Sequence, residues 1–510
     1  FFLMLRSVGT RFVARSYIGA SASVAQLHQT PRASYPLTAE TSNLLLQKVQ
    51  YAVRGEIVLR AGEYEKQLKE GKKLPFDQII YCNIGNPQQL LQKPISFHRE
   101  VLSLIESPFL MEKEEVKKVF ASDVIKRAQA YLDHLNVNGT GPYSHSQGVE
   151  LVREEVAEFI GNRDGYKASP NDIFLTNGAS SGVDMMLRMS IRNPKDGIMI
   201  PIPQYPLYSA TIPMYNGTSI PYYLNEESLW DMSLDEMNRA FKEASDNGVL
   251  PRGLVVINPG NPTGQCLTVD SMKQIIEFCA KNDVVLMADE VYQENIYGDT
   301  EFNSFRKVVF DQGAEKDLQM VSFHSISKGF LGECGKRGGY FELMNFDEET
   351  RGLIYKIASI GLCSNVTGQI MMGLSCNPPK KGDASFEKYE SEKQDILSSL
   401  KRRAQKLVKC LNSLEGVSCQ PASGSMYAFP QITLPEKAIE EANRLGKAPD
   451  MFYCLELLRE TGICVVPGSG FGQKDGTYHF RTTFLPNEKY IDEVNDRMGT
   501  FHKNFLSKFK

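Results

Sequence analysis

Short apolar runs alternate with segments of helical periodicity through the middle of the chain. Each run leads directly into a polar or Gly/Pro-rich stretch, and the runs occupy residues 172–175, 197–200, 253–257, 284–288 and 320–323. Helix-like segments at 183–190 and 269–279 lie between them. This alternation predicts an α/β fold whose large domain has a mostly parallel central sheet flanked by helices. Ligands bind beyond the carboxyl ends of the strands in such sheets, so we expect the loops after these runs to meet in one crevice.

The two ends of the chain differ from this middle part. Residues 42–70 have a helical pattern that suits an arm or the start of a small domain. A polar helical stretch at 385–414 is long enough to connect the large domain with a second one. From about residue 417 onward, short strand and helix patterns are mixed, which predicts a smaller α+β domain at the carboxyl end.

Composition and charge argue against several classes of protein. The formal net charge is −4, which provides no basic surface for nucleic acid or for an anionic membrane. The ten cysteines form no Cys-x-x-Cys pair and the seven histidines no His-Glu-x-x-His motif, so we expect reduced thiols and no metal site. No apolar run has the length that a bilayer requires. Chemistry on small molecules fits this composition better.

The first part of the chain has the composition of a targeting segment. Before Glu40 there is no acidic residue, while four arginines are spread among Ser, Ala and apolar residues: Arg6, Arg11, Arg15 and Arg32. This pattern is typical of a mitochondrial transit peptide. We therefore predict that residues 1–45 are a leader that directs the protein to the mitochondrial matrix. The alternative is a tail with no targeting role, on a cytoplasmic protein.

A lysine follows the last of the apolar runs. Residues 322–329 read SFHSISKG, so that Lys328 comes after hydroxyl residues and before a glycine. A lysine there is more often a solvated surface charge, but an aldehyde cofactor needs a lysine amine to bind covalently. Arg337 and Ser325 provide a cation and a hydroxyl for a phosphate group. Asp289, directly after the run 284–288, provides the carboxylate that keeps a pyridine nitrogen protonated, unless it only caps a helix.

Two further loops follow strand-like runs. Residues 258–264 read NPGNPTG, a rigid turn that orients the side-chain amide of Asn261 unless it is merely a connection. Residues 178–180 read GAS and open a helix, whose free backbone N–H groups suit a phosphate. Helix starts of this composition are common, so the second signal is weak by itself.

Taken together, these motifs resemble those of the class I and II aminotransferases of the pyridoxal-phosphate fold type I. The similarity extends over nearly the whole chain after about residue 45, and within the family it is close to the alanine aminotransferases. The most specific segments are GPYSHSQG at 141–148, ADEVYQ at 288–293, SKG at 327–329 with GECGKRGGY at 332–340, and PGSGFG at 467–472. The resemblance implies pyridoxal 5'-phosphate as the cofactor and ping-pong transamination, from L-alanine and 2-oxoglutarate to pyruvate and L-glutamate.

The resemblance also implies roles for individual residues. Lys328 would bind the cofactor and move the substrate α-proton, with Asp289 at the pyridine nitrogen and Tyr292 at the ring hydroxyl oxygen. The other cofactor contacts would be Asn261 at that oxygen, Tyr205 stacked on the ring, and Ala179, Ser180, Ser325 and Arg337 at the phosphate. Lys336 stays an alternative to Arg337, because many aminotransferases have the phosphate arginine at that position. Each of these residues also has a purely structural interpretation, as a core aromatic, a turn hydroxyl or a surface charge.

Substrate and partner contacts follow from the same resemblance. Arg481 would bind the substrate α-carboxylate through a bidentate fork, with Asn261 beside it, and Gly85 would let the backbone approach that carboxylate. Tyr143 resembles the tyrosine that reaches the phosphate of the neighbouring subunit. The resemblance therefore implies a homodimer with shared sites.

The implied organisation has four parts. After the leader 1–45 come an N-terminal arm with part of the small domain (46–105), the large cofactor-binding domain (106–384) and the C-terminal small domain (385–510). One alternative function is that of a glutamate–glyoxylate aminotransferase, although the tail reads SKFK and not the peroxisomal Ser-Lys-Leu. Another is that of a cofactor-binding regulator without catalysis, although the leader is too short and irregular for a helix-turn-helix domain.

Overall fold

The chain divides into two compact units, residues 1–47 and 48–510. The computed structural model describes residues 37–49, 55–135, 138–298 and 301–510. In the first unit the described residues form a turn, in which the backbone N–H of Thr38 donates to the hydroxyl of Thr41 at 2.8 Å. A 3-10 helix, η1 (Leu46–Lys48), follows. Most of the predicted leader, residues 1–36, lies outside the described residues.

The second unit is organised around a seven-stranded sheet with the strand order β2-β8-β7-β6-β5-β3-β4. Its strands are β2 (Ile173–Asn177), β3 (Asp196–Ile202), β4 (Thr218–Tyr223), β5 (Leu250–Ile257), β6 (Val285–Asp289), β7 (Met320–Ser325) and β8 (Gly338–Met344). From β4 to β7 all neighbours are parallel, whereas β8 is antiparallel to both β7 and β2. Strand β2 therefore runs in the same direction as β7. The expected mostly parallel sheet is confirmed, and every predicted run is a strand in it.

The apolar runs do not predict two strands of this sheet, β4 and β8. Strand β4 lies at the edge, where exposed Pro221 and Tyr223 interrupt the apolar pattern. Strand β8 begins with two glycines and contains Glu342, which is buried because Arg306 pairs with it at 3.0 Å. Polar residues that are stabilised by distant partners therefore obscure the strand pattern.

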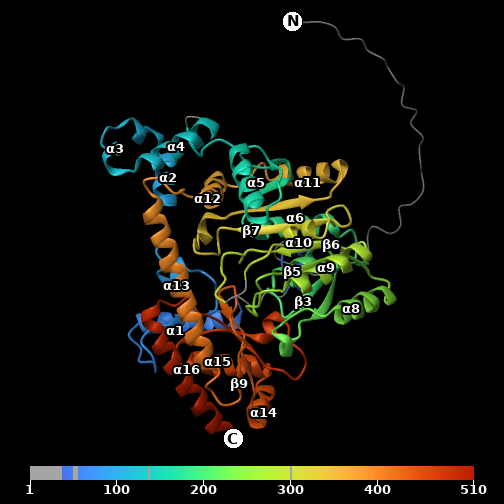
Figure 1. Cartoon of the computed structure of the whole chain (residues 1–510). Helices are drawn as coiled ribbons and strands as arrows, with labels where there is room; N and C mark the ends of the chain where they lie inside the picture. Colours follow the sequence, from blue (N-terminus) through green and yellow to red (C-terminus); the bar gives the residue numbers. More distant parts are fainter. Residues whose placement is uncertain (1–36, 50–54, 136–137, 299–300) are drawn as a thin grey trace, which may run out of the picture. The chain divides into compact units, whose positions relative to one another are not determined.

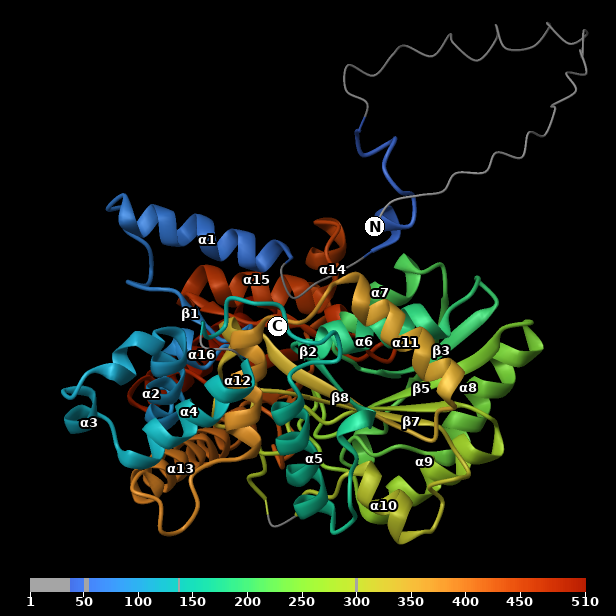
Figure 2. The same ribbon diagram turned by 90° about the horizontal axis from the view of Figure 1, so that it is seen from above.

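Alternate side chains of the strands point to two faces, and helices cover both of them (Figure 2). Val255 and Met287 belong to the core of one face, together with α6 (Ala179–Ser190), α7 (Leu207–Met214) and α11 (Glu348–Ile360). Leu254 and Leu286 point to the other face, where α8 (Leu234–Asp246), α9 (Val269–Lys281) and α10 (Phe305–Asp311) pack. The core near β2 and β8 includes α2 (Ser96–Glu106), α3 (Val116–Val119), α4 (Ser122–Leu135), α5 (Glu150–Asp164) and α12 (Val366–Cys376).

A second group of elements has its own core, drawn from both ends of the unit. Ile57 and Ala61 near its start are buried together with Leu457 and Phe501 near its end. The helices of this group are α1 (Glu56–Lys69), α14 (Glu436–Arg444), α15 (Pro449–Thr461) and α16 (Glu488–Phe509). Its strands form small sheets: β1 (Ile80–Tyr81) with β12 (Ile463–Cys464), β9 (Val417–Ser418) with β11 (Gln431–Ile432), and β14 (Phe480–Thr483) between β10 (Tyr427–Ala428) and β13 (Val466–Pro467).

One long helix, α13 (Phe386–Leu411), connects the two groups of elements (Figure 1). It begins beside α2, where Lys388 donates to Glu100 at 3.0 Å, and packs along α16 farther on. The helix predicted at 385–414 is thereby confirmed. The helix predicted at 42–70 is wrong in its extent, because the described helix α1 begins only at Glu56. The predicted boundaries at 105/106 and 384/385 stay predictions.

None of the described helices combines the length and the apolar character that a membrane-spanning segment needs.

Candidate active site

A cavity of about 140 Å³ lies at the carboxyl ends of the central strands. Ile257, Asp289 and Ser325 each lie two residues beyond a member of the core on the α6 and α7 face, so their side chains point to that face. Residues from all the loops after the predicted runs line the cavity, as expected from the sheet topology. The lining consists of Ala179, Ser180, Tyr205, Leu207, Ile257, Asn261, Asp289, Val291, Tyr292, Ser325, Ser327, Lys328 and Arg337.

Asp289 has one carboxylate oxygen with a hydrogen bond and one without. Tyr208 of α7 donates its hydroxyl to Oδ2 at 2.8 Å. Oδ1 is buried and has no hydrogen-bond partner among the described residues. Burial raises the pKa of the Asp289 carboxyl to about 6, although the bond from Tyr208 and the nearby cation of Lys328 lower it. A buried acceptor of this kind calls for a donor that the chain itself does not supply.

Lys328 lies in the connection between β7 and β8, at the same edge of the sheet. Its Nζ donates to the backbone oxygen of Gly85 at 3.3 Å and lies 5.6 Å from the centre of the Tyr292 ring. The next residue, Gly329, has a φ of +65°, and its N–H donates to the side chain of Asn295 at 2.8 Å. A glycine adopts this backbone conformation without steric cost, so the chain turns sharply beside the lysine.

Helix α6 begins at the cavity with Ala179 and Ser180. Before them, Gly178 has a φ of +77°, and a side chain there would collide with the guanidinium of Arg337. Nη2 of Arg337 donates to the Ser180 hydroxyl at 3.1 Å and to the Asn177 backbone oxygen at 2.9 Å. Free N–H groups at a helix start, a guanidinium and a hydroxyl together suit an anion.

Hydrogen bonds link the cavity to the carboxyl-terminal elements. Asn261 donates through Nδ2 to the Tyr292 hydroxyl at 3.4 Å, and its Oδ1 accepts from Nη1 of Arg481 at 3.0 Å. Arg481 lies on β14 and is 1% exposed; its Nη2 donates to the backbone oxygen of Asn83. Its Nε has no partner, and no carboxylate in the described part of the chain pairs with this guanidinium. A buried cation without a counter-charge favours a carboxylate ligand.

Four of the predicted residues are not part of the cavity wall: Gly85, Tyr143, Lys336 and Arg481. Gly85 and Arg481 nevertheless contact residues of the wall, Lys328 and Asn261 respectively. Tyr143 is 78% exposed at the surface of the chain, so its predicted contact with a neighbouring subunit stays a prediction. Lys336 ends the 3-10 helix η7 (Cys334–Lys336), where its backbone N–H donates to Glu333 at 3.1 Å. Arg337 lines the cavity and Lys336 does not, which favours the arginine as the anion-binding group.

Other residues of the site were not indicated by any motif. Tyr208 lies in the first turn of α7, three residues after Tyr205 of the preceding loop. Tyr427 lies under the Arg481 guanidinium, with 4.1 Å from Cζ to the ring centre, and accepts a hydrogen bond from Tyr292 at 3.5 Å. Its strand has only two residues, so no local periodicity marks it.

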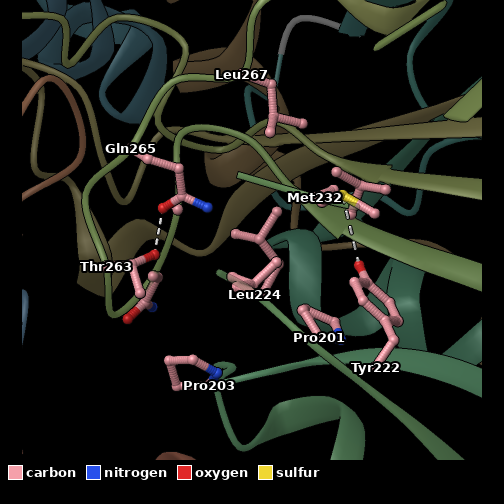
Figure 3. Close-up of a pocket in the computed structure, with 12 residues that line it drawn as sticks. Pro201, Pro203, Tyr222, Leu224, Met232, Thr263, Gln265 and Leu267 are labelled. Carbon is pink, nitrogen blue, oxygen red and sulfur yellow. Dashed lines mark hydrogen bonds between the residues drawn. The ribbon is translucent and has the colours of Figure 1, made fainter. Parts of the chain in front are cut away.

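A second cavity, of about 10 Å³, lies behind the loop that carries Asn261 (Figure 3). Its wall is mostly apolar and includes Pro201, Tyr222, Leu224, Met232 and Leu267. Within the loop, the hydroxyl of Thr263 donates to the side chain of Gln265. A space of this size holds no more than about one water molecule, so it belongs to the packing behind the loop and takes no substrate.

Similarity to known proteins identifies the family. A family model described as "Aminotransferase class I and II" matches residues 115–498. The chain belongs to this family. A curated relative, "Probable alanine aminotransferase, mitochondrial" from Dictyostelium discoideum, is 55% identical over 473 residues, which cover 91% of this chain and 88% of the relative. "Glutamate–glyoxylate aminotransferase 2" from Arabidopsis thaliana is 50% identical over 476 residues, which cover 93% of this chain and 97% of the relative.

The fold of this aminotransferase is also found among solved structures. The structure of an alanine aminotransferase from Pyrococcus furiosus matches with a TM-score of 0.72 and 24% identity, over 91% of this chain and all (100%) of the other. The predicted α/β fold of the fold type I aminotransferases is thereby confirmed. Members of the family generally depend on pyridoxal phosphate and act on amino acids and 2-oxo acids. The chain is a transaminase.

Proposed function

We propose that this aminotransferase uses pyridoxal 5'-phosphate to transfer the amino group of L-alanine to 2-oxoglutarate, giving pyruvate and L-glutamate. The observation that carries the proposal is a single cavity lined by the amine of Lys328 and by the buried carboxylate of Asp289. The choice of substrates is supported by the relative that is named an alanine aminotransferase and is 55% identical to this chain.

The side chains around the cavity fit the proposed cofactor. Oδ1 of Asp289, which has no partner among the described residues, suits a protonated pyridine nitrogen. Lys328 supplies the amine for the aldehyde, and Arg337 supplies a cation for the phosphate. The remaining proposed contacts are Tyr205 and Ile257 at the ring, Asn261 and Tyr292 at its hydroxyl oxygen, and Ala179, Ser180 and Ser325 at the phosphate. When bound, the cofactor withdraws electrons from the α-carbon of the amino acid.

In this proposal Lys328 moves the proton. Its amine, freed when the amino acid enters, accepts the α-proton on Nζ and later returns a proton to complete the transfer. Asp289 holds the proton on the ring nitrogen, because a buried carboxylate is stabilised by an adjacent positive charge. The Tyr292 hydroxyl accepts from Asn261 at 3.4 Å, and with the cofactor bound it would donate to the ring hydroxyl oxygen instead of to Tyr427.

Arg481 binds the substrate α-carboxylate in this proposal. Its planar guanidinium offers two parallel N–H bonds, and Asn261 fixes its orientation from one side. Gly85 permits the close approach of the backbone, since a Cβ there would collide with Tyr427 and lie 3.2 Å from Nζ of Lys328. Alanine and 2-oxoglutarate both carry an α-carboxylate, so one arginine serves both half-reactions of a ping-pong sequence.

We also propose that two chains associate as a homodimer, with Tyr143 reaching the phosphate of the neighbouring site. Support comes from exposed apolar side chains on two segments that contact each other: Tyr143 is 78% exposed, Ile360 77% and Leu362 51%. A hydrogen bond connects the segment around Tyr143 with helix α11, since the hydroxyl of Tyr355 and Nε2 of His145 are 3.2 Å apart. Apolar surface of this kind is typical of protein interfaces.

We further propose a mitochondrial location for the protein. The acid-free, arginine-bearing leader 1–45 supports it. The word "mitochondrial" in the name of the relative from Dictyostelium discoideum supports it independently.

The test of the proposed function is an assay of pyruvate formation from L-alanine and 2-oxoglutarate, with and without added pyridoxal phosphate. We expect turnover by the wild type and a loss of at least about 1,000-fold in Lys328→Ala, because the proton-transferring amine is removed. Lys381→Ala is the matched control, since Lys381 is an exposed lysine outside the site. Circular dichroism checks that both variants keep the fold.

Two results would contradict the proposal. Full activity of Lys328→Ala would remove the lysine from the mechanism. Turnover with L-glutamate and glyoxylate but not with L-alanine would favour the activity in the name of the Arabidopsis thaliana relative.

A further inference from the structure

Tyr427 contacts the arginine of the site and lies near its lysine, although the proposed function assigns it no role. It lies in β10, directly beside the strand β14 that carries Arg481. Its side chain is 2% exposed. Its ring and its hydroxyl make different contacts, and each contact bears on a different part of the reaction.

The ring of Tyr427 holds the guanidinium of Arg481. Cζ of Arg481 lies 4.1 Å from the centre of this ring and 4.6 Å from the centre of the Phe471 ring. Aromatic faces attract a guanidinium through cation–π contacts and leave its N–H edge free. Because a carboxylate binds along that edge, the rings set the plane in which Arg481 receives a substrate.

The hydroxyl of Tyr427 faces the space beside the amine of Lys328. A Cβ on Gly85 would collide with this hydroxyl and would lie 3.2 Å from Nζ of Lys328, so both groups border the same small space. Tyr292 donates to the hydroxyl oxygen of Tyr427 at 3.5 Å. In the part of the chain that the structure describes, no acceptor takes the hydrogen of Tyr427. A buried O–H without an acceptor is costly, which points to an acceptor that arrives with the reaction.

The charged groups around the Tyr427 hydroxyl are two cations, Lys328 and Arg481, which stabilise negative charge on its oxygen. Burial raises the pKa of the Tyr427 phenol. The cations of Lys328 and Arg481 and the hydrogen bond from Tyr292 lower this pKa by more than burial raises it, so that it lies below its ordinary value of 10.0. The phenol oxygen is thus an acceptor that the nearby cations of Lys328 and Arg481 stabilise.

We propose that Tyr427 is a positioning residue: its ring orients Arg481 for the substrate α-carboxylate, and its hydroxyl holds the Lys328 amine during proton transfer. The inference rests on the proposed function, because it concerns the carboxylate-binding and proton-transferring groups assigned there. The inference predicts separate effects on kcat and on KM, which a merely structural tyrosine would not produce. Loss of the hydroxyl lowers kcat, whereas loss of the ring raises the KM of every substrate that carries an α-carboxylate.

The experiment compares Tyr427→Phe and Tyr427→Leu as holoenzymes, with L-alanine, L-glutamate and 2-oxoglutarate as substrates. Tyr427→Phe keeps the ring, so we expect KM within about twofold of the wild type and kcat lowered about tenfold, as for one hydrogen bond to a charged group. Tyr427→Leu loses the ring as well, so we expect KM raised about tenfold for both the amino acids and the 2-oxo acid.

A control separates these effects from the loss of a buried hydroxyl in general. Tyr453, in α15, is 1% exposed, and its hydroxyl lies 2.9 Å from Nδ1 of His502. Tyr453→Phe removes a buried hydroxyl from the same group of elements, and we expect it to leave kcat and KM unchanged. Unfolding midpoints of all variants identify those that are merely destabilised.

The outcomes distinguish this inference from the proposed function. A wild type that is active with L-alanine, together with variants whose kcat and KM equal its own, would overturn the role of Tyr427 alone. A change of kcat and KM in the same proportion in both variants would also overturn it, since the ring and the hydroxyl would then have no separate tasks. A wild type without transamination of any of these substrates would overturn the proposed function and this inference with it.

Discussion

The carboxyl of Asp289 is buried at the end of β6, where burial raises its pKa from 3.8 to about 6. Since the pKa is raised on folding, the protonated form stabilises the cofactor-free fold fully below the unfolded pKa of about 4. That stabilisation is lost as the pH rises through 6. Between pH 5 and pH 8 the loss amounts to roughly 1.4 kcal/mol. The ionised carboxylate therefore lowers stability at neutral pH, where the proposed cofactor would need it.

Asp289→Asn should remove this pH dependence. Asparagine does not ionise, so we expect the unfolding midpoint of the cofactor-free variant to rise relative to the wild type by roughly 1–2 °C between pH 5 and pH 8. Transaminase activity should fall, because the amide no longer keeps the ring nitrogen protonated. Differential scanning calorimetry across this pH range measures the first effect. A difference between the two proteins that does not change with pH would contradict the assigned pKa.

The sequence indicates those site residues that lie close to a strand end. Asp289 and Lys328 follow apolar runs directly, and the topology of a parallel sheet predicts where such residues meet. Asn83 reaches the site through Arg481, and Tyr427 through Arg481 and Tyr292, all from elements that are far apart in the sequence. No local pattern encodes those contacts, so they follow only from the packing of the complete fold.

At the scale of elements, the start of α6 requires both an unusual backbone conformation at Gly178 and room for the Arg337 guanidinium. Gly178 has a φ of +77° and ψ of 164°, a conformation that is essentially restricted to glycine. A Cβ there would lie 2.8 Å from Cζ of Arg337. The guanidinium is the far end of a flexible side chain and moves aside more easily than the backbone does. A side chain at position 178 would therefore disturb the anion-binding group more than the helix.

Gly178→Ala should weaken the binding of pyridoxal phosphate. We expect its dissociation constant to rise about tenfold or more, from a backbone cost of about 1–3 kcal/mol and a displaced Arg337. Titration of the cofactor-free protein, followed by absorbance, measures the change. Gly352→Ala is the matched control, because Gly352 lies inside α11 with open space around its Cα. An unchanged dissociation constant in Gly178→Ala would show that Arg337 does not contact the phosphate.

The sequence predicts best those strands that carry mostly buried apolar side chains. Strands β5 and β6 are covered on both faces and appear in the sequence as continuous apolar runs. Strand β8 is buried too, but Gly338 lies against α12, Gly339 against the start of α6, and Glu342 pairs with Arg306. The small sheets around Arg481 have strands of two to four residues, too short to show a period of two. The sequence therefore predicts the large sheet better than the small ones.

At the scale of the whole molecule, the proposed catalytic machinery lies in the unit 48–510. The cavity and the hydrogen bonds to Gly85 and Arg481 all fall within this unit, and the family match covers 115–498. We expect a chain that begins at residue 48 to keep wild-type kcat and KM in the pyruvate assay. We expect residues 1–45, fused to a fluorescent protein, to direct it to mitochondria.

The two halves of this prediction fail independently. A truncated chain that folds but has lost its activity would show that the first unit contributes to catalysis. A reporter that stays diffuse in the cytosol would remove the targeting role of the leader. Arg6, Arg11, Arg15 and Arg32, all replaced by Ala, provide the matched control for the fusion.

The pairing of α1 with α15 has a consequence for how the protein is made. Helix α1 ends at Lys69 and its partner α15 begins at Pro449, so 379 residues lie between them along the chain. At a synthesis rate of about 5–20 residues per second, Ile57 and Ala61 leave the ribosome roughly 20–80 s before the surface that covers them. During that interval the apolar side of α1 is exposed to water and to other nascent chains. A chaperone that binds the emerging amino-terminal segment would therefore act at the moment when this protein is most prone to aggregate.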